Sequence, residues 1–490
     1  MTEIKVVDST LRDGHQSLWA CRMAAGAMLS IAPTMAEAGF KRMQIGASGN
    51  HFVVYMRYLR ENPLERLRLI SKAMPNVMLS GGIRSRGAWG FDSQSDAIVG
   101  LFIKQIAACG VKHLMIFDAL HTFSKTNEIR RIARAEGMQV EVPLVFSISP
   151  VHTDEYYAQK AAEVAKLDNV DSVLIKDSIG LLTPERTKTL VPAILKNVGK
   201  LPVEIHAHCT TGLAPLCYLE AVKLGVKTVH TCSSPLANSN SLPSTEYAVK
   251  NLRQLGYTVN LDDQMIQKMA EHFRYVGKRE GKPIGAPVEY DLFLYEHQIP
   301  GGMRSNLESQ LAMRGETGRL QEVLDETVRV RKEMGYAVMI TPLSQIMGTQ
   351  AVLNVVTGER YKIVTDELYK YALGYYGDTP APIDSNVKDK IFSTPKGKEY
   401  LNYKLYEPSI EEIRKEVGGN LSDEELLLQL VLPEENIKNL LSSGPMKTDY
   451  PSPALEKPAM VLIRELAQRS NLAYMQMQRE DFSLTLRKSG

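Results

Sequence analysis

Residues 4–17 read IKVVDSTLRDGHQS, a short apolar run that leads directly into a polar segment. The run Ile4–Val7 has the length and composition of a buried β-strand. Seven further runs of the same kind follow, separated by gaps that are each long enough for a helix. They are Arg42–Ile45, Val77–Ile83, His113–Phe117, Val140–Ile148, Ser172–Lys176, Val203–His208 and Thr228–Cys232.

Strand-then-helix units that repeat over about 240 residues predict an α/β fold closed into a (β/α)8 TIM barrel. Helical patterns fill several of the gaps, for example Pro63–Met74 and Thr153–Leu167. An open doubly wound sheet is the alternative fold. No GxGxxG loop follows the first strand, which counts against a dinucleotide-binding version of that sheet.

The strand rhythm stops after about residue 255. Helical patterns then dominate from Leu261 to Met334 and from Ile410 to Leu441, and a helix-like segment spans residues 458–478. Ser422 and Glu425 have the spacing of a capping box at the start of a helix. We therefore expect a TIM-barrel domain over residues 1–290 and a mostly helical C-terminal domain over residues 291–490.

Composition excludes several classes of protein. The 490 residues are 44% hydrophobic and 23% charged, which is ordinary for a folded globular protein. The net charge is only +2 and no long basic block occurs, so nucleic acid is not the expected partner. No apolar run approaches the roughly 20 residues of a transmembrane segment. The five cysteines lack CxxC spacing, which favours reduced thiols and a cytoplasmic location.

Candidate chemistry lies at the ends of the strands, because active sites of TIM barrels form at the C-terminal face. His206 and His208 are two residues apart on one strand, so their side chains point the same way. Two such imidazoles can bind a transition metal, although a structural pair is the commoner explanation of HxH alone. Asp13, at the end of another strand, would add an oxygen ligand and makes the two interpretations equally well supported.

Lys176 ends a buried apolar strand, where a charged amine is costly unless it is paired or neutralised. One interpretation is a salt bridge with Asp177 or another acidic group. The other is that the amine has reacted with carbon dioxide to form a carbamate that binds a metal. Arg12, Arg84 and Arg86 are candidate clamps for a substrate carboxylate, since guanidinium groups bind carboxylates bidentately.

Three segments resemble the motifs of one enzyme family. TLRDGHQS at residues 10–17 resembles the TLRD(A/G)HQS signature of the biotin-dependent carboxyltransferases that act on 2-oxo acids. That family includes the carboxyltransferase domain of pyruvate carboxylase, the oxaloacetate decarboxylase alpha subunit and the keto-acid subunit of transcarboxylase. KDSIGLLTP at 176–184 is similar to its KDMAGLLTP block, and HAH at 206–208 to its HTH. Further similar segments lie at residues 300–302, 305–307, 341–345 and 374–377.

The resemblance implies a TIM barrel with a helical domain that forms a funnel over its mouth. It also implies a divalent metal (zinc, cobalt or manganese), bound by Asp13, His206, His208 and Lys176 as N6-carboxylysine. Arg12 and Gln16 would hold the keto acid, and Arg84 and Arg86 lie where they could assist. The implied reaction moves a carboxyl group between carboxybiotin and pyruvate, oxaloacetate or a related 2-oxo acid through a metal-stabilised enolate.

The resemblance also bears on partners. No AMKM biotinylation motif and no ATP-binding carboxylase portion occur in the sequence. Biotin is therefore expected on a separate biotin carboxyl carrier protein, alongside other carboxylase or transcarboxylase subunits. Family members are usually homodimers, so a homodimer is expected here.

Among the departures from the family pattern, three are expected in the substrate pocket. Val53 stands at the aspartate of the WGGATFD segment, and Gly81 stands at the substrate-clamping arginine of the LLRG block. Asn240 occupies the catalytic place of the threonine that shuttles a proton between biotin and the keto acid, and an amide cannot relay a proton as a hydroxyl does. These changes predict an altered pocket, and with it either a different carboxylic acid as substrate or a subunit that binds metal but turns over poorly.

Two other functions remain open on the sequence. One is a biotin-independent lyase or condensing enzyme of the wider aldolase-like barrel superfamily, whose members share the TLRDG-type aspartate and the HxH pair. Those relatives generally lack the metal-binding lysine, so Lys176 counts against this function. The other is a non-catalytic assembly subunit, which has no need to keep the four metal ligands.

Overall fold

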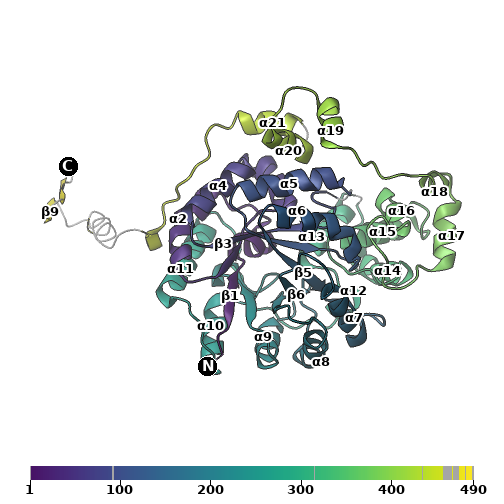
Figure 1. Ribbon diagram of the computed structural model, residues 1–490, viewed down its shortest axis with the longest axis horizontal. Helices are drawn as coiled ribbons and strands as arrows, with labels where there is room; N and C mark the ends of the chain where they lie inside the picture. Colours follow the sequence, from purple (N-terminus) through teal and green to yellow (C-terminus); the bar gives the residue numbers. More distant parts are fainter. Residues whose placement is uncertain are drawn as a thin grey trace.

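The computed structural model describes residues 2–90, 93–313, 315–432, 434–455, 466, 474–479 and 482–487. Its centre is a closed barrel of parallel strands, ordered β1 to β8 around the ring (Figure 1). The predicted TIM barrel is confirmed, and the open sheet is wrong. The strands are β1 (Lys5–Asp8), β2 (Arg42–Gln44), β3 (Met78–Arg84), β4 (His113–Phe117), β5 (Gln139–Val145), β6 (Ser172–Asp177), β7 (Val203–Ala207) and β8 (Thr228–Thr231).

Helices cover the outside of the barrel. The helices predicted at Pro63–Met74 and Thr153–Leu167 correspond to α4 (Pro63–Ala73) and α7 (Asp154–Val164). Among the helices that the structure describes, none combines the length and the apolar content needed to cross a membrane. The others of this part are α1 (His15–Trp19), α2 (Ala25–Glu37), α3 (Gly49–Val54), α5 (Asp96–Ala108), α6 (Asn127–Ala135), α8 (Pro184–Leu195), α9 (Ala214–Lys223), α10 (Thr245–Gln254) and α11 (Asp263–Arg279).

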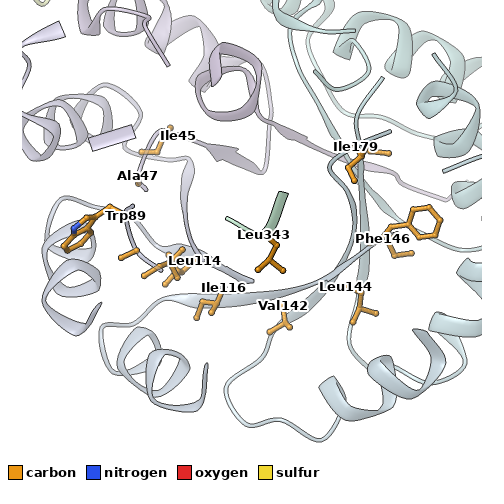
Figure 2. Packing of buried hydrophobic residues seen from close by; sticks show 14 of the residues in the cluster. Ile45, Ala47, Trp89, Leu114, Ile116, Val142, Leu144, Phe146, Ile179 and Leu343 are labelled. Atoms are coloured by element: carbon orange, nitrogen blue, oxygen red, sulfur yellow. The ribbon is translucent and has the colours of Figure 1, made fainter. Parts of the chain in front are cut away.

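Alternation along the strands separates the barrel wall into two faces. Leu114 and Ile116 on β4, with Val142 and Leu144 on β5, point toward the surrounding helices and belong to the main core (Figure 2). The intervening positions face the barrel interior. On the β4–β6 side that interior is apolar, and it is closed by Val338 and Ile340 of the C-terminal half. This interior cluster consists of Met115, Phe117, Val145, Leu174, Val338 and Ile340.

The rest of the described barrel interior is largely polar. Arg42 on β2, Glu141 on β5, Glu204 and His206 on β7, and His230 on β8 are all buried. Burial of charged side chains is costly unless they are paired, so this cluster needs internal partners. Its contacts are described with the site below.

The C-terminal half is mostly helical, as expected. Helix α15 packs along α14, and α20 returns to the outside of the barrel against α5. The predicted capping box of Ser422 and Glu425 starts α20. The helices are α12 (Leu294–His297), α13 (Gly301–Ala312), α14 (Leu320–Glu333), α15 (Leu343–Thr357), α16 (Asp366–Ala372), α17 (Ser385–Ser393), α18 (Pro395–Tyr400), α19 (Ile410–Val417), α20 (Asp423–Val431) and α21 (Glu434–Leu441).

The helix expected over residues 458–478 lies largely outside the described residues. Its last residues are in β9 (Tyr474–Arg479), a strand that pairs antiparallel with β10 (Phe482–Arg487). The expectation was therefore wrong at this end. Alternating polar and apolar residues in YMQMQR and FSLTLR suit strands better than a helix.

Candidate active site

Four polar side chains converge at the C-terminal end of the barrel. Asp13 comes from the π-helical turn η1 (Thr10–Gly14) that directly follows β1. Lys176 stands near the end of β6, His206 lies on β7, and His208 follows the last residue of that strand. All four are buried. The residues that the sequence analysis grouped as metal ligands therefore lie together in space.

The distances within this group are short. The Nζ atom of Lys176 lies 3.0 Å from Nε2 of His206, which lies 3.3 Å from Nε2 of His208. The carboxylate of Asp13 approaches His206 Nε2 to 3.2 Å and His208 Nε2 to 3.5 Å. Donor atoms of Asp13, His206 and His208 all lie within 4.8 Å of one another. Two imidazole nitrogens and a carboxylate oxygen are a donor set suited to zinc or another transition metal.

Neighbouring groups orient these ligands. The Nδ1 atom of His208 lies 2.6 Å from the backbone carbonyl oxygen of Asn240, and a carbonyl only accepts, so Nδ1 carries the proton. The lone pair of His208 is thereby directed through Nε2 into the site. Ser17 donates to Oδ1 of Asp13 at 2.9 Å, and Arg12 forms an ion pair with the same carboxylate. Such outer contacts fix the geometry of metal ligands.

Nearby charges and burial shift the pKa values of three residues in the site. Burial alone would raise the pKa of Asp13, but Arg12 and then His208 outweigh it and hold that pKa well below its usual range. Burial, with a contribution from Arg12, lowers the pKa of Lys176 to about 7. Burial and the nearby Lys176 keep the pKa of His206 well below its usual value. Near neutral pH the group thus holds a charged carboxylate, a neutral imidazole and a partly neutral amine.

The salt bridge between Lys176 and Asp177 is not formed in the described part of the chain. The carboxylate of Asp177 instead turns into the following loop. There it accepts backbone N–H groups from Gly180 at 2.8 Å and from Leu182 at 2.7 Å. The amine of Lys176 points the opposite way, toward His206. The hypothesis that Lys176 forms a salt bridge with Asp177 is therefore wrong.

A cavity of about 260 Å³ opens beside the four side chains. Arg12, Gln16, Arg84 and Asn240, which were singled out in the sequence, all line it. So do residues of the C-terminal half, among them Met303, Ile340, Thr341, Ser344 and Gln345. Both halves of the chain thus contribute to the same pocket.

Arg84 has a free hydrogen-bond donor with which it can bind an anion in this pocket. Its Nη2 donates to Oδ1 of Asn50 at 2.7 Å, whereas its buried Nη1 has no hydrogen-bond partner. Burial, with Arg12 nearby, lowers the pKa of Arg84 to about 10, so the guanidinium stays charged at neutral pH. A buried cation with a free donor is a suitable partner for a substrate carboxylate.

Other predicted pocket residues lie elsewhere. Arg86 is engaged by Glu407 and, at 3.2 Å, by Asp96, and it does not line this cavity. Val53 and Gly81 do not line it either. At Gly81 an added Cβ would lie 2.8 Å from the carbonyl oxygen of Ala47, so the backbone leaves no room for a side chain there. Of the three departures from the family pattern, only Asn240 faces the pocket.

Several pocket residues escaped the sequence analysis. Ser17 orients Asp13, and Asn50 orients Arg84. Ser17 closes the TLRDGHQS segment, which could have marked it, whereas Asn50 has no signal beyond its place after a strand. Ser178 and Gln345 each bring a buried polar oxygen without a partner to the cavity. Gln345 lies in the TPLSQ segment, and that resemblance could have marked it as a site residue.

Protein-family models match two parts of the chain. Residues 102–272 match the HMGL-like family, which corresponds to the second part of the barrel. Residues 294–460 match the conserved carboxylase domain, which covers most of the helical C-terminal half.

Curated relatives align along most of the chain. A pyruvate carboxylase subunit of Methanocaldococcus jannaschii is 37% identical, over 89% of this chain and 77% of the relative. The methylmalonyl-CoA carboxyltransferase 5S subunit of Propionibacterium freudenreichii is 33% identical, over 88% and 86%. The 2-oxoglutarate carboxylase large subunit of Hydrogenobacter thermophilus is 31% identical, over 88% and 67%. Among solved structures, the carboxyl transferase domain of Rhizobium etli pyruvate carboxylase with oxamate and biotin has a TM-score of 0.81 at 25% identity, covering 93% of this chain and 80% of that chain.

Proposed function

The chain belongs to the family of biotin-dependent carboxyltransferases that act on 2-oxo acids, and on this premise we propose its reaction and its site. It is the carboxyltransferase subunit of a multi-subunit biotin-dependent enzyme. It moves a carboxyl group between carboxybiotin on a separate carrier and pyruvate, oxaloacetate or a related 2-oxo acid. The observation that carries this proposal is the convergence of Asp13, Lys176, His206 and His208 beside a pocket that holds Arg12 and Arg84.

The metal ligands proposed are Asp13, His206, His208 and carboxylated Lys176. The donor set fits a divalent metal such as zinc, cobalt or manganese, since two imidazoles and a charged carboxylate meet there. When bound, the metal would polarise the keto oxygen of the substrate and stabilise the enolate.

Carboxylation of Lys176 would turn a poor ligand into an anionic oxygen ligand. The neutral amine attacks carbon dioxide, a C–N bond forms, and one proton leaves to solvent as the carbamate is produced. The lowered pKa supports this step, because only the neutral amine is nucleophilic. Burial beside His206 supports it as well, since a carbamate in this place would face the metal rather than water.

The substrate carboxylate is proposed to bind Arg12 and Arg84, with Gln16 beside it. Gly81 stands where the family has its substrate-binding arginine, and Arg84 replaces that arginine in this proposal. Asn50 holds the guanidinium of Arg84 in place. The apolar interior cluster, above all Phe117 and Ile340, lies at the same cavity and limits the water that reaches it. A dry pocket strengthens the attraction between the guanidinium groups and the substrate anion.

Proton transfer is where this site differs from the family. Asn240 lines the pocket where the family carries a threonine, and its amide cannot pass a proton on. The hydroxyls of Ser178 and of other pocket residues, such as Thr210 and Ser344, remain as groups that exchange protons. The same metal ligands are compatible with a related 2-oxo acid whose reaction needs no proton relay at Asn240.

Assembly and location complete the proposal. We propose a homodimer that works with a biotin carboxyl carrier protein and with other carboxylase or transcarboxylase subunits. We propose a barrel domain over residues 1–290 and a helical domain over residues 291–490, which is supported by the helices that follow the last barrel strand. Residues of both parts line the pocket, as a funnel over the barrel mouth would require. All five cysteines are free and buried, which supports a reducing, cytoplasmic location.

Oxaloacetate decarboxylation by the purified chain, with and without free biotin, tests the function. Bound metal is measured on the same sample, and a His208→Ala variant serves as the metal-free reference. Biotin-stimulated pyruvate formation by metal-loaded protein is the expected result. Decarboxylation at the same rate with and without biotin would favour a biotin-independent lyase. Absence of both metal and activity would favour an assembly subunit. Full metal without activity on oxaloacetate would direct the assay to other 2-oxo acids, starting with 2-oxoglutarate.

A further inference from the structure

A network of buried hydrogen bonds connects His206 to other polar side chains in the barrel interior. The Nδ1 atom of His206 lies 3.3 Å from Nδ1 of His230 on β8. The Nε2 atom of His230 lies 2.8 Å from Oε2 of Glu204, which is two residues before His206 on β7. Glu204 is in turn held by Arg42 of β2, whose Nη1 donates to Oε1 at 3.2 Å and whose Nη2 pairs with Oε2.

The shortest of these contacts favour one arrangement of protons. Glu204 is ion-paired with Arg42, so its carboxylate is charged and only accepts. His230 must therefore carry its proton on Nε2. With its proton on Nε2, the neutral ring of His230 offers Nδ1 as an acceptor, and this atom lies 3.3 Å from Nδ1 of His206. The unprotonated Nδ1 of His230 then accepts the N–H of His206 Nδ1. That leaves the Nε2 lone pair of His206 directed at Asp13, Lys176 and His208.

The lower cluster is not a second metal site. Glu141, Glu204 and His230 bring three donor atoms close together, as a metal site would. Arg42 already supplies the cation, since Nη2 contacts Glu141 at 2.9 Å as well as Glu204. The guanidinium of Arg42 thus takes the place that an ion would have between the two carboxylates, and Nδ1 of His230 is the atom of the cluster that faces His206.

We propose that His230 and Glu204 are positioning residues that hold His206 in the tautomer and orientation required to bind the metal. The role resembles that of the carboxylate–histidine pairs that orient metal ligands in other proteins, here extended by one imidazole and held by Arg42. This inference rests on the proposed metal site, and it identifies the residues that keep His206 oriented for metal binding. Loss of such an outer partner typically lowers metal affinity 10–100-fold.

The variants separate positioning from general stability. His230→Leu removes the acceptor for His206, whereas His230→Asn keeps an oxygen near the place of Nδ1 and serves as the conservative rescue. His113→Leu is the matched control, because His113 is equally buried in the barrel interior and bonded to Ser80 at 2.8 Å. Glu204→Gln keeps the shape of the second member while removing its charge.

The experiment measures zinc affinity by competition with a chromophoric chelator, on the full chain, together with the melting temperature of each metal-free variant. We expect His230→Leu to bind zinc 10–100-fold more weakly than wild type, His230→Asn to recover most of the loss, and His113→Leu to stay within threefold. Should His230→Leu not fold, Glu204→Gln carries the same comparison with an expected loss of about tenfold.

Two outcomes would overturn the proposal. One is zinc affinity of His230→Leu and Glu204→Gln within threefold of wild type. The other is an equal loss of affinity in His113→Leu, which would show a general effect of the barrel interior. Wild-type protein that binds no zinc would remove the proposed metal site itself, and is thus distinguished from failure of the positioning role alone.

Discussion

Lys176 and His206 stand opposite each other on neighbouring strands. The backbone register of β6 and β7 pairs the two residues, and Nζ of Lys176 lies 3.0 Å from Nε2 of His206. Parallel strands place paired side chains on the same side of a sheet. The lysine and the histidine are therefore held together by the barrel wall itself and not by a flexible loop.

Removing the amine should empty the metal site. Lys176→Ala is expected to lose stoichiometric metal and biotin-stimulated activity, because the carbamate oxygen is a proposed ligand. A small carboxylic acid such as acetate should restore part of both, since it can place an oxygen in the vacated space. Metal content and activity are measured together, with Lys223→Ala, an exposed lysine on α9, as the control. Metal-loaded wild type with an unmodified amine at Lys176 in a high-resolution map would contradict the carbamate.

The same lysine should make the stability of metal-free protein depend on pH. Its pKa is about 7 in the folded chain and near 10.4 in an unfolded one, so between these values the unfolded state binds more protons. Stability from this group therefore rises with pH from about 7 toward 10.4, and below pH 7 the cost of the buried charge is complete. In carbon dioxide-free buffer, Lys176→Met should melt above wild type at pH 6.5, and the gap should narrow by pH 9. A constant gap would show that the lysine keeps an ordinary pKa.

Arg84 should control substrate binding without affecting the metal. Arg84→Met removes the charged donor, and a charge-assisted hydrogen bond of about 1.5–3 kcal/mol corresponds to a loss of roughly 10–100-fold in kcat/KM. The loss should appear mainly in KM, since the guanidinium binds the carboxylate before and during reaction. Arg86→Met is the matched control, because that arginine is occupied by Glu407 outside the pocket. Equal effects of the two substitutions would remove Arg84 from the clamp.

Asn240→Thr tests whether the missing hydroxyl limits turnover. The contact of Asn240 with His208 is made by its backbone carbonyl, so metal content should not change. If oxaloacetate is handled as in the family, biotin-stimulated decarboxylation should rise several-fold, whereas Asn240→Ala should give no increase. A decrease with Thr would indicate that the amide itself contacts the substrate. Initial rates at saturating biotin provide the measurement.

Local patterns were enough to predict much of the barrel and its ligands. The length, composition and spacing of the β-rich runs identified all the barrel strands, and the HxH spacing placed His206 and His208 on one face. These features succeed because side-chain direction along a strand depends only on sequence distance. The register between strands does not, so the contact between Lys176 and His206 could be expected only from the resemblance.

The choice among arginines was beyond sequence analysis. Arg84 and Arg86 are two residues apart and equally plausible as clamps, yet only Arg84 enters the pocket, and Arg86 is held by Glu407 from far along the chain. The exclusion of a side chain at Gly81 likewise depends on the path of the backbone at Ala47. Both outcomes follow from how separate segments pack, which no local pattern records.

By itself, the sequence determined the order of strands and helices, the face on which the histidines lie and the family to which the motifs point. Only the tertiary structure decided that Asp177 turns away from Lys176, and that Arg84 rather than Arg86 joins Arg12 in the pocket. It also decided that Arg42, Glu204 and His230 form a hydrogen-bonded cluster next to His206. The physical reason is ring closure. It brings β2, β7 and β8 around one interior, so that buried charges far apart in sequence must find their partners in one another.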